Sequence, residues 1–472
     1  GFDAIDAASG KFNITNRFYF TNLKKYQIHY SVLANGKTVK SGKVSLDIAP
    51  QASKEFTVPV SGLKARPGTE YFVNFSVIAV EPEPLIPAGY EIAYDQFRLP
   101  VEAERNTYKA NGPALQTQTQ EDELTVSSSK VNFVFNKKSG LVTSYKVDGT
   151  EYFKDGFGIQ PNFWRAPNDN DYGNGAPKRL HVWKKSSKDF HVADTKVSTE
   201  DKAVLLQATY LLAAGNLYVV TYKIYPSGIV HVNAKFTSTD MQAAETEVSE
   251  ATRMATFTPG SDAARKAASK LEVPRIGVRF RLPAQMNNVQ YFGRGPEENY
   301  IDRNHGTMVG IYQTTADKMY FNYVRPQENG HHTDTRWLNL SPDKGNGLVI
   351  VADSLIGFNA LRNSVEDFDS EEALPHPYQW NNFSPEEATN HDEKAARNVL
   401  RRMHHVNDIT PRDFVEVCVD MKQQGVGGYD SWGARPEPFH QIPANREYNW
   451  GFTLVPVRSG SQATEATKYD YR

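Results

Sequence analysis

Apolar and polar residues alternate along the first part of the chain, as in strands that bury one face. In residues 26–32 every second side chain is apolar. The dipeptide Asn35-Gly36 follows and readily adopts the positive φ angles of a tight hairpin, so residues 38–46 should return as the partner strand. Residues 71–80 form another such strand. The spacing of these strands, with no helical period between them, predicts a small β-sandwich.

Strand patterns continue beyond a polar stretch and predict a second, much larger all-β region. Residues 106–122 are rich in Gln and Thr and are expected to form a linker. The clearest hairpin joins residues 217–225 to residues 229–236 through a Pro-Ser-Gly turn. Further strands are expected at residues 131–135, 141–147, 277–281, 348–352, 414–420 and 448–455.

Together these patterns predict an all-β protein with two domains and a short tail. Residues 1–105 have the size and strand spacing of an immunoglobulin-like β-sandwich, and residues 123–459 should form one large antiparallel sandwich. Residues 460–472 are expected to be a disordered tail. Residues 367–398 depart from the strand pattern because they are acidic, and a helical pattern over residues 391–406 predicts a surface helix after a solvated loop.

Composition and charge are those of a globular protein and disfavour two classes of partner. Of 472 residues, 39% are hydrophobic and 23% are charged, which is enough material for two or three domains. Lys and Arg total 53 and Asp and Glu total 55, giving a net charge of −2. This charge gives no general attraction to nucleic acid or to an anionic membrane. We therefore expect a soluble protein with no nucleic-acid partner and no membrane partner.

The chain starts at Gly1 without a Met or a signal peptide. We therefore expect it to be part of a longer polypeptide, and its compartment, cytoplasmic or periplasmic, stays open. The single cysteine, Cys418, lies in an apolar run and is expected to be buried rather than reactive. Aromatic residues make up 12% of the chain. This content suits strands and also the stacking of sugar rings.

Polar residues crowd in four clusters where a β protein would normally alternate. The clusters lie at residues 162–173 (NFWRAPNDNDYG), 293–303 (GRGPEENYIDR), 326–337 (PQENGHHTDTRW) and 425–432 (GVGGYDSW). Taken singly, Asn-, Asp- and Gly-rich clusters make turns through side-chain bonds to the backbone. Arg165 and Arg336 could tie such loops together through paired bonds to carboxylates.

Metal binding is a weaker interpretation of the same clusters. Asp169 and Asp171 stand two residues apart, as in part of a calcium loop, but the other EF-hand ligands and the closing Glu are missing. The pair His331-His332 and the pair at residues 404–405 lack matching zinc-ligand spacings. We therefore expect no metal site in this chain.

In their residues and in their order along the chain, the four clusters resemble motifs of the β-galactosidase family in which a catalytic barrel is flanked by sandwich domains. The matches are RAPxDND at residues 165–171, GPxENYxDR at 295–303, YVxPxENG at 323–330 and GGxDSW at 427–432. Residues 87–99 are similar to the end of the preceding sandwich domain of that family. The resemblance covers nearly the whole chain, and residues 367–398 depart from it.

The resemblance implies that the large region is a galactose-mutarotase-like supersandwich that caps the barrel and completes one side of the sugar pocket. It implies that Trp432 reaches the pocket and stacks on the sugar, with Gly173 as the hinge of a mobile loop at the rim. The remaining motif residues are expected to support the pocket: Arg165, Asn170, Asp171, Glu298, Asn299, Asp302, Arg303, Glu328, Asn329, Arg336, Asp430 and Ser431.

The residues around Trp432 suit a loop that presents a side chain. Gly425, Gly427 and Gly428 allow a tight, irregular backbone path. Asp430 and Ser431 can brace that path through bonds to backbone amides. The alternative, in which Trp432 belongs to a buried core, stays open.

No catalytic residue is expected in this chain. A retaining glycosidase requires two carboxyl groups about 5 Å apart. The resemblance places both on the barrel, and this sequence shows no alternating strand–helix pattern of a barrel. The implied partners are the barrel and N-terminal domains of the same enzyme, or a large subunit, and a galactoside. No cofactor is expected here, whereas the resemblance implies Mg²⁺ and a monovalent ion or Ca²⁺ in the intact enzyme.

Three functions compete at this point. The wording of the four motifs favours the C-terminal part of a β-galactosidase that acts on terminal non-reducing β-D-galactosides. A stand-alone aldose epimerase would need an acid–base pair, for which His331 and Glu328 are the nearest candidates. A carbohydrate-binding module would use Trp432 without a partner.

Overall fold

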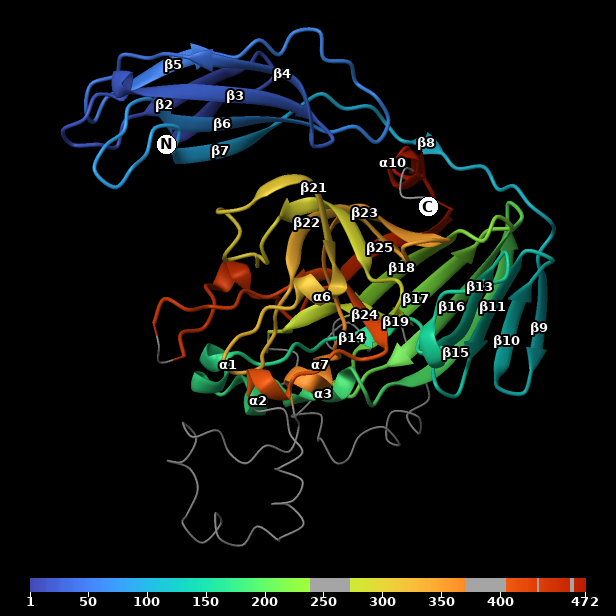
Figure 1. Ribbon diagram of the computed structural model, residues 1–472. Helices are drawn as coiled ribbons and strands as arrows, with labels where there is room; N and C mark the ends of the chain where they lie inside the picture. The colour runs from blue at the N-terminus through green and yellow to red at the C-terminus, as the bar shows by residue number, and fades with distance from the viewer. Residues whose placement is uncertain (238–271, 370–404, 431–432, 459–461) are drawn as a thin grey trace, which may run out of the picture. The chain divides into compact units, whose positions relative to one another are not determined.

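The computed structural model describes residues 1–237, 272–369, 405–430, 433–458 and 462–472. The chain divides into two compact units. Unit 1 comprises residues 1–108, 308–312 and 464–471, and unit 2 comprises residues 109–307 and 313–463 together with Arg472. Long antiparallel strands dominate both units (Figure 1), so the predicted all-β fold is confirmed.

Unit 1 is built around two antiparallel sheets. One sheet has the order β1-β2-β5, with β1 (Phe2–Asp6), β2 (Lys11–Thr15) and β5 (Ser53–Thr57). The other has the order β4-β3-β6-β7, with β3 (Tyr26–Ala34), β4 (Lys37–Val44), β6 (Tyr71–Ala79) and β7 (Glu91–Leu99). The predicted hairpin between β3 and β4 turns at Asn35 and Gly36, which have φ angles of 44° and 74°.

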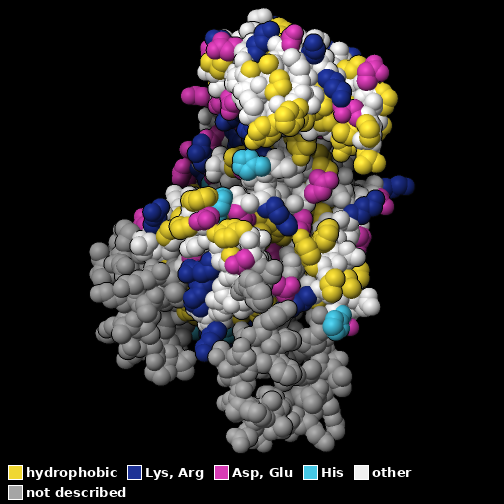
Figure 2. All heavy atoms as spheres, turned by 90° about the vertical axis from the view of Figure 1, so that its left-hand side faces the viewer, with side chains coloured by type: hydrophobic (Ala, Val, Ile, Leu, Met, Phe, Trp, Pro, Cys, Tyr) yellow, Lys and Arg dark blue, Asp and Glu magenta, His cyan; other side chains and the backbone are white. Residues whose placement is uncertain are grey.

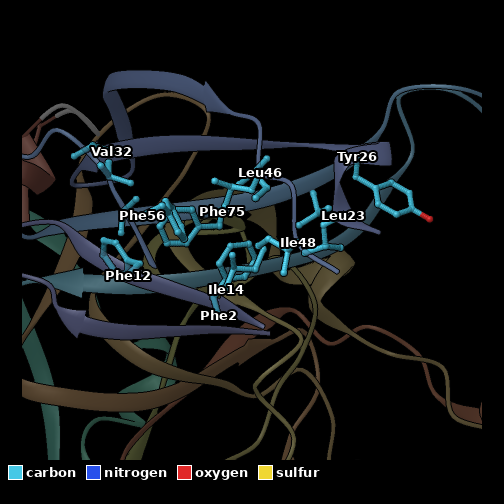
Figure 3. Close-up of a cluster of buried hydrophobic side chains, with 14 of the residues drawn as sticks. Phe2, Phe12, Ile14, Leu23, Tyr26, Val32, Leu46, Ile48, Phe56 and Phe75 are labelled. Carbon is cyan, nitrogen blue, oxygen red and sulfur yellow. The ribbon is translucent and has the colours of Figure 1, made fainter. Parts of the chain in front are cut away.

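Aromatic rings fill the space between the two sheets of unit 1 (Figure 3). The Phe75 ring of β6 stacks on Phe2 with centroids 4.8 Å apart and meets Phe12 edge-on at 4.9 Å. Phe56 meets the same ring edge-on at 5.4 Å. Side chains alternate across a strand, so the apolar positions of β6 point inward together, and this core holds the sandwich closed.

The described residues also form a five-stranded sheet in unit 2 and a twelve-stranded sheet that lies in unit 2 except for residues 308–312. The five-stranded sheet has the order β13-β12-β11-β10-β9, with β9 (Gln116–Gln120), β10 (Glu123–Ser127), β11 (Val131–Asn136), β12 (Leu141–Val147) and β13 (Thr150–Glu151). The main path of the larger sheet is β14-β19-β24-β23-β25-β18-β17-β16-β15, with β22 pairing β23 and β20, and β20 pairing β21. Their bounds are β14 (Gln160–Asn162), β15 (His191–Glu200), β16 (Ala203–Leu211), β17 (Leu217–Ile224), β18 (Val230–Thr237), β19 (Arg275–Pro283), β20 (Asn288–Gly295), β21 (Met308–Thr315), β22 (His332–Ser341), β23 (Gly347–Leu361), β24 (Phe414–Gln423) and β25 (Tyr448–Val457).

The described helices are short and connect strands. They are η1 (Leu23–Lys25), η2 (Lys154–Gly156), α1 (Asp169–Gly173), α2 (Ala176–Arg179), α3 (His181–Ser186), α6 (Ala316–Met319), α7 (Val365–Phe368), η5 (Val406–Asp408), η6 (Pro438–His440) and α10 (Ala463–Ala466). Helices α1, α3 and α7 lie along one edge of unit 2 (Figure 1). In the described part of the chain, no helix has the length and apolar character needed to cross a membrane.

The predicted linker over residues 106–122 is wrong for its second half. Residues 116–120 form strand β9, which pairs along its whole length with β10. Every residue of β9 is exposed, because β9 is the outer strand of its sheet. A strand without a buried face shows no apolar alternation, so its polar sequence resembles a linker.

The predicted disordered tail over residues 460–472 is also wrong where the structure describes it. Helix α10 is followed by β26 (Tyr469–Asp470), which pairs in parallel with β8 (Asn106–Thr107). Tyr471 is buried, and its ring lies 5.0 Å from that of Tyr108. The tail is ordered by contacts with residues far away in the sequence, which local composition does not reveal.

The acidic segment and its predicted surface helix lie mostly outside the described residues. The structure describes the start of the segment, where α7 lies, and resumes at residue 405. The helical pattern over residues 391–406 therefore stays a prediction.

Candidate functional site

Two motifs of unit 2, at residues 162–173 and 293–303, contact the residues that follow β24. We call residues 424–430 the glycine loop. Arg165 follows β14, and only 2% of its side chain is exposed. Its Nη1 donates to the Gln424 carbonyl at 2.8 Å, and its Nη2 donates to the Gly425 carbonyl at 3.1 Å. Nη2 also lies 3.0 and 3.1 Å from the two carboxylate oxygens of Asp171. Arg165 therefore joins the first motif to the glycine loop.

Helix α1 holds Asp171 in position for this contact. The Asn168 side chain accepts from the Asp171 amide at 2.8 Å, and the Asp171 carboxylate accepts from the Asn168 amide at 3.1 Å. This reciprocal pair is a capping box, which starts the helix. Asn168 Nδ2 also donates to the Val426 carbonyl at 3.2 Å. With its amide oxygen and nitrogen exchanged, Asn170 accepts from Gly428 and donates to the Asp430 carbonyl, both at 3.2 Å.

Asp302 of the second motif holds the other side of the glycine loop. Its two carboxylate oxygens accept from the amides of Val426 at 3.0 Å and Gly427 at 2.9 Å. A β-carbon on Gly425 would lie 2.4 Å from Asp302 Oδ2, so no larger residue fits there. Gly427 has a φ of 69°, a conformation that glycine adopts without strain. The loop path therefore depends on glycine at these two positions.

Glu298 and Asn299 connect the second motif to the third. The Glu298 carboxylate accepts from the Gly330 amide at 2.7 Å and from Arg303 Nη2 at 2.8 Å, and the Tyr323 hydroxyl also donates to it. These bonds hold the backbone that leads into β22.

Asn299 is fully buried and uses both ends of its amide. Its Nδ2 donates to the Arg294 and Glu297 carbonyls, and its Oδ1 accepts from the amide and hydroxyl of Thr333. Asn329 works in a similar way, because its side chain accepts from the Phe321 amide and donates to the Gln327 carbonyl. Both side chains fix the backbone of turns through these bonds.

A buried ionic cluster lies beside these motifs. Arg275 of β19 is 0% exposed; its Nη2 lies 2.7 Å from Glu328 Oε1 and its Nε lies 3.2 Å from Asp420 Oδ2. Its Nη2 also donates to the Gln423 side chain, one residue before the glycine loop. His331 Nδ1 lies 3.7 Å from Asp420 Oδ2. One guanidinium thus faces two buried carboxylates far apart in the sequence, Asp420 in β24 and Glu328 in the loop before β22.

Burial sets the protonation of this cluster. Removal from water raises the pKa of the Asp420 carboxyl to about 7 and also raises the pKa of Glu328, against the opposite effect of Arg275. Burial and the nearby positive charge of Arg275 hold the pKa of His331 well below its usual range. His331 is therefore neutral at pH 7.

Arg325 of the third motif packs against α1. Its guanidinium lies 3.7 Å from the centre of the Tyr172 ring and its Nη1 lies 3.1 Å from Asp169 Oδ1. Burial raises the pKa of Tyr172 to about 12. The two carboxylates suggested as part of a calcium loop, Asp169 and Asp171, thus pair with different arginines. Among the described residues, no group of three or more His, Cys, Asp and Glu side chains is placed to hold a metal.

Three further predicted residues lie outside the glycine loop or outside the described residues. Arg336 donates to the Asp334 carbonyl and lies over the Phe292 ring. Ser431 and Trp432 lie outside the described residues, so their predicted roles stay predictions.

Two further predicted residues can be placed. Gly173 ends α1, and a β-carbon on Gly433 would lie 2.4 Å from its carbonyl carbon. The hinge role of Gly173 stays a prediction. Asp430 Oδ1 accepts from the Ala434 amide at 2.9 Å and so braces the backbone, as expected.

The residues that link the motifs are not among the residues predicted from the sequence. Arg275 and Asp420 are the centre of the ionic cluster, and Asn168 bonds both α1 and the glycine loop. A signal did exist, since a charged residue within an otherwise apolar strand is expected to be paired when the strand is central. Asp420 ends such a run in β24.

The acid–base pair considered for an aldose epimerase is not accessible. Glu328 is 4% exposed and paired with Arg275, while His331 is 1% exposed and lies against the Tyr300 ring with centroids 5.5 Å apart. A sugar cannot reach either side chain in this structure. Both residues serve as interior contacts that hold β22 against β19 and β24.

The fold and the site define an all-β protein in which Arg165 and Asp302, from two separate motifs, bond the backbone of one loop. Residues 127–454 match the family described as "Beta galactosidase small chain", and residues 12–100 match "Beta-galactosidase, domain 4". The first match spans most of the chain. The chain belongs to the β-galactosidase small-chain family.

The chain is similar in sequence to several β-galactosidases over nearly its whole length. It is 32% identical over 457 residues to a β-galactosidase of Priestia megaterium and 24% identical over 459 residues to one of Streptococcus thermophilus. Each alignment covers 96% of this chain but 38% of the relative. The chain therefore spans well under half the length of these relatives.

Among solved structures, a galactose 1-epimerase from Lactobacillus acidophilus is similar with a TM-score of 0.34 and 8% identity, covering 74% of this chain and 98% of that chain. A putative aldose 1-epimerase from Escherichia coli gives a TM-score of 0.32. These scores are low, so the family assignment rests on the sequence matches.

Proposed function

We propose that this chain is the non-catalytic part of a β-galactosidase and completes its sugar pocket. The enzyme would hydrolyse terminal non-reducing β-D-galactosides, with its catalytic barrel in a part of the polypeptide, or a large subunit, that this chain lacks. The observation that carries the proposal is the support of one glycine loop by the motifs of a β-galactosidase-family chain. That loop leads directly into Trp432.

Such support makes sense for a loop that must hold a side chain in place for a ligand. Arg165, Asn168 and Asp302 together bond the backbone of residues 424–427. A platform held by buried partners loses little freedom when a ligand binds. The indole of Trp432 would offer its face to the apolar C–H side of galactose.

The carboxylates of the site support this division of work. A retaining glycosidase needs one carboxylate as nucleophile and another as acid and base. Asp171 is paired with Arg165, Asp302 accepts from two backbone amides, and Glu328 is paired with Arg275. Each of these carboxylates is committed to the loop or the interior, so we place the reaction chemistry outside this chain. The described residues offer no metal cluster either, and we assign the Mg²⁺ and the monovalent ion or Ca²⁺ to the intact enzyme only.

The test uses two polypeptides. The first is this chain, and the second is the part of the Priestia megaterium β-galactosidase that this chain does not match, which we call the complementary portion. We expect no hydrolysis of a chromogenic β-galactoside by this chain alone and measurable hydrolysis by the mixture. Trp432→Ala should raise the KM of the mixture roughly 5- to 150-fold, because a lost stacking platform costs about 1–3 kcal/mol.

The matched control is Phe439→Ala, which removes an exposed aromatic ring from η6 outside the glycine loop and should leave KM unchanged. Two results would contradict the proposal. One is turnover by this chain alone, and the other is a complex of the two polypeptides in which Trp432→Ala has no effect on KM. Binding of galactose by this chain alone, lost in Trp432→Ala, would favour a carbohydrate-binding module.

A further inference from the structure

One end of the sandwich in unit 1 exposes a group of large apolar side chains. Strand β3 begins at Tyr26, which pairs with Ala79 at the end of β6. The loop before β3 and the loop after β6 therefore meet at this end. We call it the end face, and it carries Phe18, Tyr19, Phe20, Val80, Leu85 and Tyr90, all exposed. Hydrophobic side chains gather on the upper body, which is unit 1, in the space-filling view (Figure 2).

Side-chain hydrogen bonds fix the backbone of the first loop of the end face, at residues 16–21. Asn16 is buried, and its Nδ2 donates to the carbonyls of Thr21 at 2.8 Å and Ile48 at 3.1 Å, while its Oδ1 accepts from the Phe18 amide at 3.0 Å. Gln51 Nε2 donates to the carbonyls of Arg17 and Phe18 at 3.1 and 3.0 Å. The backbone is thus fixed by bonds on several sides.

This fixed backbone turns two aromatic rings toward solvent. Tyr19 is 75% exposed and Phe20 is 96% exposed, and their ring centroids lie 6.3 Å apart. A loop that is free to rearrange would cover such rings, because exposed apolar surface is unfavourable in water. The rings stay exposed because the loop is built to hold them there.

The second loop presents Leu85 at a cost in backbone strain. Glu83 and Ile86 exchange backbone hydrogen bonds of 2.8 and 3.0 Å across a tight turn, with Pro84 and Leu85 at its tip. Leu85 has a φ of 67°, where this kind of turn favours glycine, and its side chain is fully exposed. The Leu85 side chain makes no stabilising apolar contact within the turn because it is fully exposed. We therefore infer that it contacts a partner outside the turn.

Contacts beneath the end face join its two loops into one surface. Phe18 stacks on the Tyr26 ring with centroids 5.7 Å apart. The Tyr26 hydroxyl donates to Glu83 Oε1 at 3.2 Å, and Lys25 Nζ lies 2.9 Å from the same oxygen. Tyr26 therefore connects the loop that carries Phe20 to the turn that carries Leu85.

We propose that the end face is a docking surface for another domain of the same β-galactosidase polypeptide, within the portion that this chain does not match. The inference rests on the proposed function. Three observations select this partner: the relatives are much longer than the matched region, the surface is preorganised, and it is rich in Tyr and Phe, as interface centres are. The Gly1 nitrogen donates to the Thr15 carbonyl at 2.9 Å, so β1 begins beside the loop that carries Phe18 and Phe20.

The test measures binding of this chain to the complementary portion by sedimentation velocity and titration. The variant carries Tyr19→Ser, Phe20→Ser and Leu85→Gly together. It should weaken binding by at least about tenfold, because exposed aromatic and apolar anchors dominate interface affinity. The melting temperature of the variant chain alone should equal or exceed that of the unaltered chain, since Leu85→Gly relieves strain. The control is Val39→Ser, which removes one exposed apolar side chain at the opposite end of unit 1 and should leave binding unchanged.

The outcomes separate the inference from the proposed function. Equal binding by variant and unaltered chain, or no binding by the unaltered chain, would overturn the docking surface. A concentration-dependent dimer of this chain that the variant abolishes would also overturn it, because the occupant would be a second copy. A lowered melting temperature of the variant alone would do the same, by showing that this chain covers the face itself. Binding that the variant weakens, without any restored hydrolysis, would support the docking surface and contradict the proposed function.

Discussion

Phe75 in unit 1 and Arg275 in unit 2 are both fully buried, yet their surroundings differ in kind. Phe75 lies among other phenyl rings, none of which demands a particular partner. Arg275 lies against two carboxylates and an amide side chain, each of which would be left without compensation if the guanidinium were removed. The first core depends on volume and shape, and the second depends on charge matching.

This difference predicts which substitutions each core tolerates. An apolar core accepts other apolar residues of similar size with small losses. A buried ion pair accepts few replacements, because a single change exposes the desolvation cost of the remaining charge. In this protein Arg275 of the ionic core bonds the side chain of Gln423, the residue before the glycine loop.

The largest expected effect comes from Arg275→Met. The change keeps much of the side-chain volume but leaves Glu328 and Asp420 buried without a positive partner. We expect unit 2 to lose about 3–5 kcal/mol of unfolding free energy. The sequence of unit 1 contains no tryptophan, so tryptophan fluorescence during urea unfolding does not report on unit 1.

The control for this variant is Lys235→Met, which breaks a half-exposed pair with Glu447 on the same unit. It should cost less than about 1 kcal/mol. Similar losses in the two variants would remove the distinction between a buried ionic core and an ordinary surface pair.

A smaller effect is expected from Phe75→Leu in unit 1. The replacement stays apolar and the neighbouring rings can adjust, so the loss should stay below about 1.5 kcal/mol. Hydrogen exchange of peptides from β6 measures this locally, and Tyr94→Leu on the exposed part of β7 serves as the control with almost no change. If Phe75→Leu cost as much as Arg275→Met, the contrast between the two cores would fail.

The smallest expected effect is a change in how the stability of unit 2 depends on pH. Burial raises the pKa of Asp420 to about 7 in the folded chain, whereas an unfolded aspartate releases its proton near a pKa of about 4. Between these values the unfolded chain has lost a proton that the folded chain keeps, so the stability contributed by Asp420 is full below about pH 4 and is lost as the pH rises to about 7. Asp420→Asn should therefore show a smaller loss of unit 2 stability across this range.

Three ionisable groups described above face Asp420, and the direction of the pKa shift of each is defined. The pKa of Glu328 is raised, as is that of Asp420. His331 is neutral and Arg275 keeps its positive charge. Urea midpoints at pH 4, 5.5 and 7, followed by tryptophan fluorescence, measure the slope. Identical slopes for Asp420→Asn and the unaltered chain would mean that Asp420 is ionised throughout and that Arg275 outweighs its burial.

Most strands and the members of the four motifs could be predicted from the sequence. Strand β12 has the predicted bounds, and β3, β6, β11 and β24 start at the predicted residues. The motifs were recognisable because Arg165, Asp171 and Asp302 stand in a characteristic order with Gly, Asn and Pro. The convergence of these residues on one loop was not predictable, since nothing local indicates which carbonyls or amides a buried side chain will reach.

Sequence by itself determined the all-β class, the hairpin turn at Asn35-Gly36 and the family, because alternation, turn residues and motifs are properties of neighbouring residues. Tertiary structure alone decided the ionic cluster, the order of residues 462–472 and the edge strand β9. Arg275 and Asp420 meet because β19 pairs with β24, and β26 is ordered because it pairs with β8. Such pairings join residues that are distant along the chain, so their energies depend on the folded neighbours rather than on any local pattern.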